Sequence, residues 1–214
     1  MTVPIPTPIY RIIHINNLNV VLRRGGIPAH NSTPNDGIKY RTIHNSEIQS
    51  QRGDTTLHCG PCGVMHDYVP FYFGHLSPML LQLHTGRVAG YDEGQEPIIY
   101  LVSTAQTVQD SGVQFVFSDG HGIARYTQWF DDLDDLDKVD WTAVNAKYWH
   151  DTVDDMDRQR RKQAEFLVYN SCEWNIISEI GVINRDMKSR VREILEEFPN
   201  VTVPDIRIRR EWYY

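Results

Sequence analysis

Short apolar segments are spread along the whole chain and are separated by polar, turn-rich stretches. They are rich in β-branched and aromatic residues, and they cover residues 9–15, 69–73, 98–103, 114–117, 165–169, 176–183 and a last stretch near 206–209. Segments of this length and composition predict β-strands. Helix signals lie between them without a regular strand–helix alternation, so the sequence predicts an α+β fold with a strand-dominated core and peripheral helices.

Four helices are expected from capping residues and turn signals. Asn16 and Asn17 are candidate caps for a helix that runs to Arg24 and ends at two glycines. Ser77 followed by Pro78 predicts the start of a second helix over 79–84, and another helix is expected over 188–198. The polar stretch 28–56 predicts a long loop with one short helix near 45–51. No repeat or linker divides the chain, so we expect a single domain over 1–214.

The sequence gives no sign of export or membrane insertion. No apolar run approaches the roughly 18 residues that a membrane helix needs, and the first residues resemble no signal peptide. The three cysteines leave one unpaired under any disulfide scheme, which favours a reducing compartment. We therefore expect a cytoplasmic protein without a membrane partner.

The acidic charge of the chain comes from one segment. The formal net charge is −7, yet residues 131–157 hold ten Asp and two Lys, so the rest of the chain carries about +1. A basic cluster over 158–162 follows at once. The acidic segment has no EF-hand pattern, because Asp137 and Ala143 stand where the loop that starts at Asp132 needs glycine and glutamate. The net charge excludes a broadly basic DNA coat but not a narrow strand-binding site.

Common catalytic motifs are missing, since the chain contains no GxGxxG, GxxxxGK[ST], HExxH or GxSxG. Cys59 and Cys62, with His58 and His66 nearby, form the most metal-like group. Pro61 lies inside the cysteine pair, and the His-x-Glu of the zinc deaminases is absent. A turn with two incidental thiols is the preferred interpretation, and we expect no metal.

Glu165 is the sharpest single signal. It opens the apolar run 165–169, where strand alternation places Glu165 and Leu167 on one face and Phe166 and Val168 on the other. A carboxylate at this position lies either at a solvated strand end or in a cleft with a partner. The spacing of polar and apolar residues alone favours a solvated strand end for Glu165.

The chain resembles the DarT family of DNA ADP-ribosyltransferase toxins nearly from end to end. The order of the shared pieces is specific, although each piece alone is weak. They are residues 6–14 (PTPIYRIIH) with Asn17 and Leu18; Ile48, Gln49 and Arg52; 59–61 (CGP); 67–73 (DYVPFYF) with 77–79 (SPM); 119–121 (DGH); Tyr148 and Trp149; and 160–168 (RRKQAEFLV). Cys62 departs from the family's Cys-Gly-Pro-Gly, which leaves a redox or metal role open.

The resemblance implies a split mixed sheet of the ADP-ribosyltransferase type that holds NAD in a cleft and transfers ADP-ribose to a thymidine base in single-stranded DNA. Glu165 and Arg52 are then the catalytic candidates. A carboxylate stabilises the oxocarbenium-like state and lies near the proton transfer, whereas arginine is too basic to take a proton. Arg52 is therefore expected to hold the pyrophosphate or the thymine anion. The implied NAD cleft is lined by Arg11, Ile12, Ile13, His14, Asn16, Arg52, Tyr72 and the 28–52 loop. Without the resemblance, His14 and Tyr72 are interpreted as core residues.

The resemblance also implies a DNA path and a partner. Expected DNA contacts are a helix start and a set of basic and aromatic residues near Glu165: Ser77, Pro78, Met79, His121, Tyr148, Trp149, His150, Arg158, Arg160, Arg161 and Lys162. For each cation the alternative is a charged helix that balances the Asp-rich segment. The implied partner is a DarG-like antitoxin with a macrodomain. Two other functions stay open, namely ADP-ribosylation of RNA or protein, and non-catalytic nucleic-acid binding.

Overall fold

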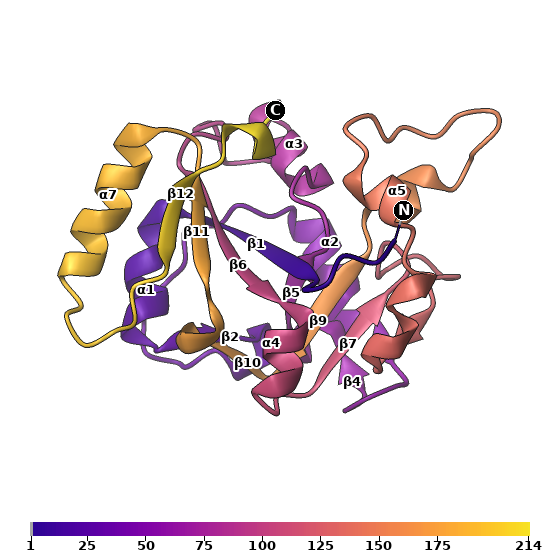
Figure 1. Ribbon diagram of the computed structural model, residues 1–214, viewed down its shortest axis with the longest axis horizontal. Helices are drawn as coiled ribbons and strands as arrows, with labels where there is room; N and C mark the ends of the chain where they lie inside the picture. The colour runs from indigo at the N-terminus through magenta and orange to yellow at the C-terminus, as the bar shows by residue number, and fades with distance from the viewer. Residues whose placement is uncertain (1) are drawn as a thin grey trace.

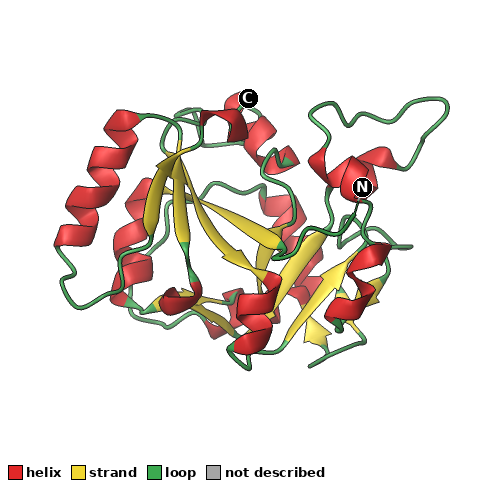
Figure 2. Ribbon diagram, viewed as in Figure 1, coloured by secondary structure: helices red, strands yellow, loops and turns green. Residues whose placement is uncertain are grey.

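A computed structural model describes residues 2–214, and one eight-stranded sheet forms its centre (Figures 1 and 2). All seven predicted strands belong to this sheet, which confirms the α+β class with a mixed sheet. The parallel pair is β11–β12, and the other neighbours are antiparallel. In spatial order the strands are β12 (Asp205–Ile208), β11 (Glu179–Val182), β6 (Ile98–Thr104), β1 (Pro8–His14), β5 (Tyr68–Tyr72), β9 (Glu165–Tyr169), β7 (Phe115–Ser118) and β8 (Trp129–Phe130).

The sheet opens between β1 and β5. These two strands share one register pair, Tyr10 with Tyr72, whereas β1 and β6 pair from Pro8 to His14. Beyond the shared pair the strands diverge, and the Pro70 carbonyl of β5 accepts a hydrogen bond from the Arg11 side chain of β1, whose Nη1 lies 2.8 Å away. Figure 1 shows β12, β11, β6 and β1 fanning away from β5, β9 and β7. This divergence of the two groups of strands is the split in the sheet that the resemblance implies.

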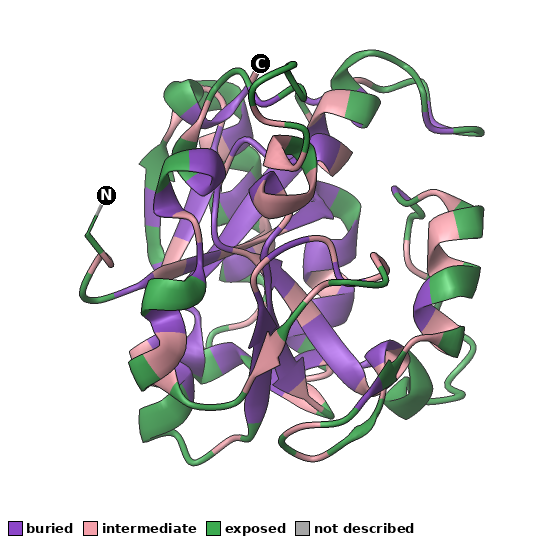
Figure 3. Ribbon diagram, turned by 90° about the vertical axis from the view of Figure 1, so that its right-hand side faces the viewer, coloured by how far each residue is buried: buried purple, intermediate pink, exposed green. Residues whose placement is uncertain are grey.

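Helices lie around the sheet, and the central strands are buried (Figure 3). The larger core includes apolar residues of α1 (Leu18–Arg23), α4 (Ala105–Asp110), α5 (Trp141–Asn145) and α7 (Arg185–Glu196). A second core packs α3 (Pro78–His84) against the C-terminal aromatic residues, and a third lies under the small sheet β3 (Thr56–Leu57) with β4 (Gly63–Val64). The remaining elements are α2 (Ser46–Asp54), α6 (Arg158–Lys162), and β2 (Gly26–Pro28) paired with β10 (Ser171–Glu173).

Capping explains where most of the helices begin. Ser77 Oγ accepts the Leu80 N–H and Pro78 is the first helical residue, as predicted. Asn45 Oδ1 caps α2, which is longer than expected, and Asn184 starts α7 three residues before the predicted position. The start of α1 is different, because a short 3₁₀ turn lies between β1 and this helix.

The 3₁₀ turn Ile15–Asn17 replaces the predicted asparagine cap. His14 Nδ1 accepts the Asn16 N–H, and the Asn17 side chain instead bonds the backbone N–H and carbonyl of Arg41. A tertiary partner thus takes the side chain that local sequence assigns to a helix end. No helix within residues 2–214 combines the length and the apolar character needed to cross a bilayer.

Candidate active site

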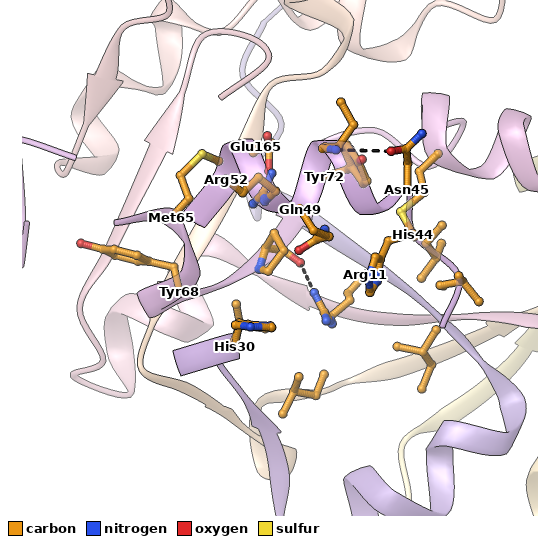
Figure 4. Close-up of a pocket in the computed structure, with 18 of the residues that line it drawn as sticks. Arg11, His30, His44, Asn45, Gln49, Arg52, Met65, Tyr68, Tyr72 and Glu165 are labelled. Carbon is orange, nitrogen blue, oxygen red and sulfur yellow. Dashed lines mark hydrogen bonds and ion pairs between the residues drawn. The ribbon is translucent and has the colours of Figure 1, made fainter. Parts of the chain in front are cut away.

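A cavity of about 460 Å³ lies where the two halves of the sheet diverge (Figure 4). Its walls come from β1, β5, α2, the start of β9 and the polar stretch after β2. The stretch predicted as a long loop therefore forms one side of the cavity. The volume is within the range of small-molecule binding sites.

Glu165 is held firmly at one end of this cavity. It is 3% exposed, and register places it directly opposite Tyr72 on the neighbouring strand. Its Oε2 accepts a hydrogen bond from Arg52 Nη1 at 2.7 Å, and its Oε1 accepts the Gly122 N–H at 3.2 Å. Its own N–H donates to Ser118 Oγ at 3.1 Å. A carboxylate bound through both oxygens has a fixed orientation.

Gly122 is part of this arrangement because no side chain fits there. A Cβ at Gly122 would lie 2.4 Å from Met65 Cε and 3.1 Å from Glu165 Oε1. The absence of a side chain lets the backbone N–H reach the carboxylate. Sequence reasoning missed both Gly122 and Met65, although the Gly-His-Gly order at 120–122 was an available signal.

The cavity contains arginine N–H groups that have no hydrogen-bond partner among residues 2–214. Arg52 comes from α2 and is 7% exposed, and its Nη2 is buried without a hydrogen bond, as is the Nε of Arg11. Buried donors of this kind are normally satisfied. Two guanidinium groups that face the same space suit a ligand with a pyrophosphate. In Figure 4, Arg52 lies beside Glu165, and Arg11 lies further along the wall.

Three histidines and a tyrosine that line the cavity have pKa values shifted towards their neutral forms. Burial lowers the pKa of His121, His44 and His66, so these imidazoles are neutral near pH 7. Burial, and next the charge of Glu165, raises the pKa of Tyr72. The cavity is also lined by three arginines, Arg11, Arg41 and Arg52, and by one carboxylate, Glu165.

The structure brings together part of the predicted NAD set. Ile12, Ile13, Arg52 and Tyr72 line the cavity, together with Arg11. His14 and Asn16 do not line it.

His14 makes contacts that suit a structural role. It is 1% exposed, caps the 3₁₀ turn through Nδ1, and its Nε2 lies 3.2 Å from Glu93 Oε2. Glu93 in turn pairs with Arg41. The interpretation of His14 as a satisfied core histidine explains these contacts, and its role in NAD binding stays a prediction.

The structure likewise brings only some of the predicted DNA-binding residues to the cavity. Pro78, Met79 and His121 line the cavity. Ser77 is buried as a helix cap, and Trp149 is buried, with its Nε1 donating to the Tyr214 hydroxyl at 3.3 Å. Tyr148 and His150 are exposed on the chain that projects between α5 and α6 (Figure 1).

The basic cluster mostly faces internal partners. Arg160 pairs with Asp119 and Asp157, and Arg161 pairs with Asp140 and Asp155. These ion pairs fit the alternative that α6 balances the Asp-rich segment.

Lys162 and Arg158 complete the cluster. Lys162 is 3% exposed, and its Nζ donates to the Val144 and Ala146 carbonyls at 2.6 and 2.9 Å. Arg158 is half-buried and has no ion pair within residues 2–214. Arg158 is thus the cluster member whose charge is most available to a phosphate.

The cysteine pair lies in a tight turn between β3 and β4, as expected. The Cys62 N–H donates to the Cys59 carbonyl at 3.0 Å, and Gly60 and Cys62 have φ of 55° and 63°. Both thiols are free, with Cys59 half-buried and Cys62 exposed. Across residues 2–214, no group of three or more His, Cys, Asp or Glu side chains is placed to hold a metal ion.

Comparison with known proteins gives consistent matches over the whole chain. The family model described as "ssDNA thymidine ADP-ribosyltransferase, DarT" matches residues 10–214. A DNA ADP-ribosyl transferase from Thermus sp. (strain 2.9) is 44% identical over 213 residues, which cover 100% of this chain and 99% of the relative.

Solved structures also match this chain over nearly its whole length. Thermus sp. 2.9 DarT in complex with ADP-ribosylated ssDNA has a TM-score of 0.94 at 43% identity and covers 100% of this chain and 99% of its own. The same Thermus protein in complex with NAD+ has a TM-score of 0.90 at 43% identity, with 100% of both chains covered. Thermosipho africanus DarTG in complex with ADP-ribose shares the fold, with a TM-score of 0.76 at 17% identity over 96% of this chain and 50% of that one.

Proposed function

The chain belongs to the DarT family, and from this premise we propose that it transfers ADP-ribose from NAD to a thymidine base in single-stranded DNA and releases nicotinamide. The observation that carries the proposal is the buried Glu165 carboxylate, bound by Arg52 and by the Gly122 N–H at the end of a cavity of suitable volume. The Thermus complexes with NAD+ and with ADP-ribosylated ssDNA support both substrates.

The residues of the cavity fit an NAD molecule as the donor substrate. The unpartnered Arg11 Nε and Arg52 Nη2 supply N–H donors for phosphate oxygens or for a developing anion. Tyr72 lies opposite Glu165 and offers an aromatic face for the nicotinamide ring. Ile12 and Ile13 supply apolar wall.

Glu165 performs the central step. Its carboxylate stabilises the positive charge that develops on the ribose while the bond between C1′ and the nicotinamide nitrogen breaks and the electron pair leaves with nicotinamide. A new bond forms between C1′ and thymine N3, and the N3 proton is lost. Glu165 accepts that proton, and its partner Arg52 stabilises the negative charge on the thymine, because an arginine is too basic to take a proton itself.

We propose single-stranded DNA and a DarG-like macrodomain antitoxin as partners, so that the chain acts as the toxin of a pair. The fold shared with Thermosipho africanus DarTG supports the second partner. We place its action in the cytoplasm, where both substrates occur together, with residues 1–214 acting as one domain.

The test is incubation with NAD and single-stranded oligonucleotides, followed by mass spectrometry. We expect a thymidine adduct of one ADP-ribose together with free nicotinamide, and slower NAD hydrolysis without DNA, in which water replaces thymine. Glu165→Gln keeps the size of the side chain but removes its charge, and it should lower both rates by about 10²-fold or more. Arg52→Ala should abolish the DNA adduct.

RNA and protein are included as alternative acceptors. Modification of either one with no DNA product would contradict the proposed acceptor. A fully active Glu165→Gln variant would exclude the proposed catalytic role, and thermal melting shows whether each variant is folded.

A further inference from the structure

Residues 212–214 form an aromatic cluster that packs beside α3 (Figure 1). Trp212 and Tyr213 are buried, and Tyr214 is half-buried. The Gln95 side chain fixes the backbone of Tyr214, because its carbonyl accepts the Tyr214 N–H at 3.0 Å and its NH₂ group donates to the Tyr214 carbonyl at 2.5 Å. These residues therefore have a defined place in the fold, and the side chain of Tyr214 has a fixed origin.

The aromatic cluster binds the three residues that lead into α3. The ring of His75 stacks on Trp212, with the ring centres 5.6 Å apart. The Tyr214 hydroxyl lies 3.1 Å from the Leu76 carbonyl and 3.4 Å from the Ser77 carbonyl, and it donates its proton on this side. The position of the first turn of α3 therefore depends on contacts with residues 212–214.

The same hydroxyl also binds the chain that projects between α5 and α6. Trp149 Nε1 donates to Tyr214 Oη at 3.3 Å, and Trp149 is buried. A phenol can donate one hydrogen bond and accept another at the same time. Tyr214 Oη thus joins two segments that are far apart in the sequence.

Both segments carry residues on which DNA binding was predicted. Pro78 and Met79, the first residues of α3, line the cavity that contains Glu165. Tyr148 and His150 are exposed on either side of the buried Trp149. Exposed aromatic rings of this kind can stack with the bases of a single strand. Trp149 is therefore placed to anchor its two neighbours, and Tyr214 is the hydrogen-bond partner of that anchor.

We propose that Tyr214 is a positioning residue for DNA, whose hydroxyl fixes the start of α3 relative to residues 148–150 so that one strand can contact both. The inference rests on the proposed function and adds a residue that acts through others. Glu165 is bound by Arg52 and by Gly122, and Tyr214 bonds neither of these within residues 2–214. We therefore expect the reaction of NAD with water to be independent of the Tyr214 hydroxyl.

The experiment compares Tyr214→Phe with a matched variant, Tyr213→Phe, in the full chain. Tyr214→Phe removes Oη and keeps the ring that stacks on His84. Tyr213→Phe removes a buried hydroxyl from the adjacent residue, which donates to the Ile98 carbonyl at 2.8 Å and not to either segment. Each variant is assayed with NAD and the single-stranded oligonucleotide that the wild type modifies fastest.

For Tyr214→Phe we expect KM for DNA to rise about 5-fold, because one shared hydrogen-bonding group is lost. The kcat for NAD hydrolysis without DNA should stay within about 2-fold of the wild type. Tyr213→Phe should lower the melting temperature at least as much as Tyr214→Phe, yet leave KM for DNA within about 2-fold. A general loss of stability cannot produce this difference between neighbouring residues.

Trp149→Phe tests the same hydrogen bond from its other end. This variant keeps an aromatic ring and lacks the Nε1 donor, so KM for DNA should rise here as well. The variant that combines both changes should have a KM well below the product of the two separate effects, because each change breaks the same bond. Strictly additive effects would contradict the coupling of the two segments through Tyr214.

Two further results would overturn the inference. One is an active wild type whose KM for DNA is unchanged in Tyr214→Phe or rises equally in Tyr213→Phe. The other is an equal fall of NAD hydrolysis and DNA modification in Tyr214→Phe, since the hydroxyl would then support the fold as a whole. A wild type that makes no DNA product would instead contradict the proposed function, so the two failures are distinguishable.

Discussion

At the residue scale, the position of the Glu165 carboxylate depends on a neighbour that has no side chain. Gly122 donates its N–H to Oε1 and leaves room for Met65 beside the carboxylate. The other carboxylate oxygen of Glu165, Oε2, accepts a hydrogen bond from Arg52. The carboxylate is thus fixed from two sides by groups from distant parts of the chain, and small displacements at such a site lower the rate strongly.

Gly122→Ala tests this dependence. The added Cβ would overlap Met65 Cε and press on Glu165 Oε1. We expect kcat for NAD hydrolysis to fall by about 10-fold or more, with a loss of about 1–3 kcal/mol in the free energy of unfolding. Adding Met65→Ala should recover part of both losses by making space, and Met65→Ala alone is the control. An unchanged kcat in Gly122→Ala would show that this close approach is unimportant.

At the element scale, α6 organises the segment that precedes Glu165. Arg160 binds Asp119 through two N–H groups and packs against Gly120, where a Cβ would lie 2.3 Å from Nη1. The Arg160 carbonyl accepts the His121 N–H at 2.9 Å. Gly122, two residues after Gly120, is the donor to Glu165. Arg160 is therefore a positioning residue that acts on the carboxylate through residues 119–122.

Arg160→Met separates this role from a contact to DNA. If Arg160 positions the segment, kcat for NAD hydrolysis without DNA should fall by about 5-fold or more, because that reaction also needs Glu165. If it contacts a phosphate, only KM for DNA should rise. Arg192→Met, which changes an exposed arginine on α7, is the matched control. A normal kcat without DNA would contradict the positioning role.

At the scale of the whole molecule, charge and burial control stability. Three carboxylates of the Asp-rich segment, Asp140, Asp155 and Asp157, pair with Arg160 and Arg161 of the adjacent α6, so these two arginines are neutralised within one part of the fold. Burial also keeps several histidines neutral by lowering their pKa. They are His14, His44, His66, His75 and His121. Protonating them must oppose folding.

His75 gives the clearest pH prediction, since burial lowers its pKa to about 4 from an ordinary value of 6.5. The unfolded chain binds the proton first, so the stabilisation is complete above pH 6.5 and is lost as the pH falls towards 4. The loss is up to about 3 kcal/mol. His75→Phe keeps the stacking on Trp212, and its unfolding free energy should depend less steeply on pH between 4 and 6.5. Equal slopes in chemical denaturation would contradict this.

The sequence by itself determined the elements and the family. Apolar runs and caps predicted the seven main strands and the start of α3, because side-chain period and capping are local properties. The ordered motifs identified the DarT family and singled out Arg52 and Glu165. Spacing alone favoured a solvated Glu165, because burial depends on residues far away in the chain.

Only the tertiary structure decided which charges are free. Arg52 and Glu165 are 113 positions apart and become partners because α2 and the start of β9 border the same cavity. Arg160 and Arg161 lie beside Glu165 in sequence, yet their charges are matched by carboxylates from other segments. Local composition predicts a cation, but its availability depends on the partners that the fold brings to it.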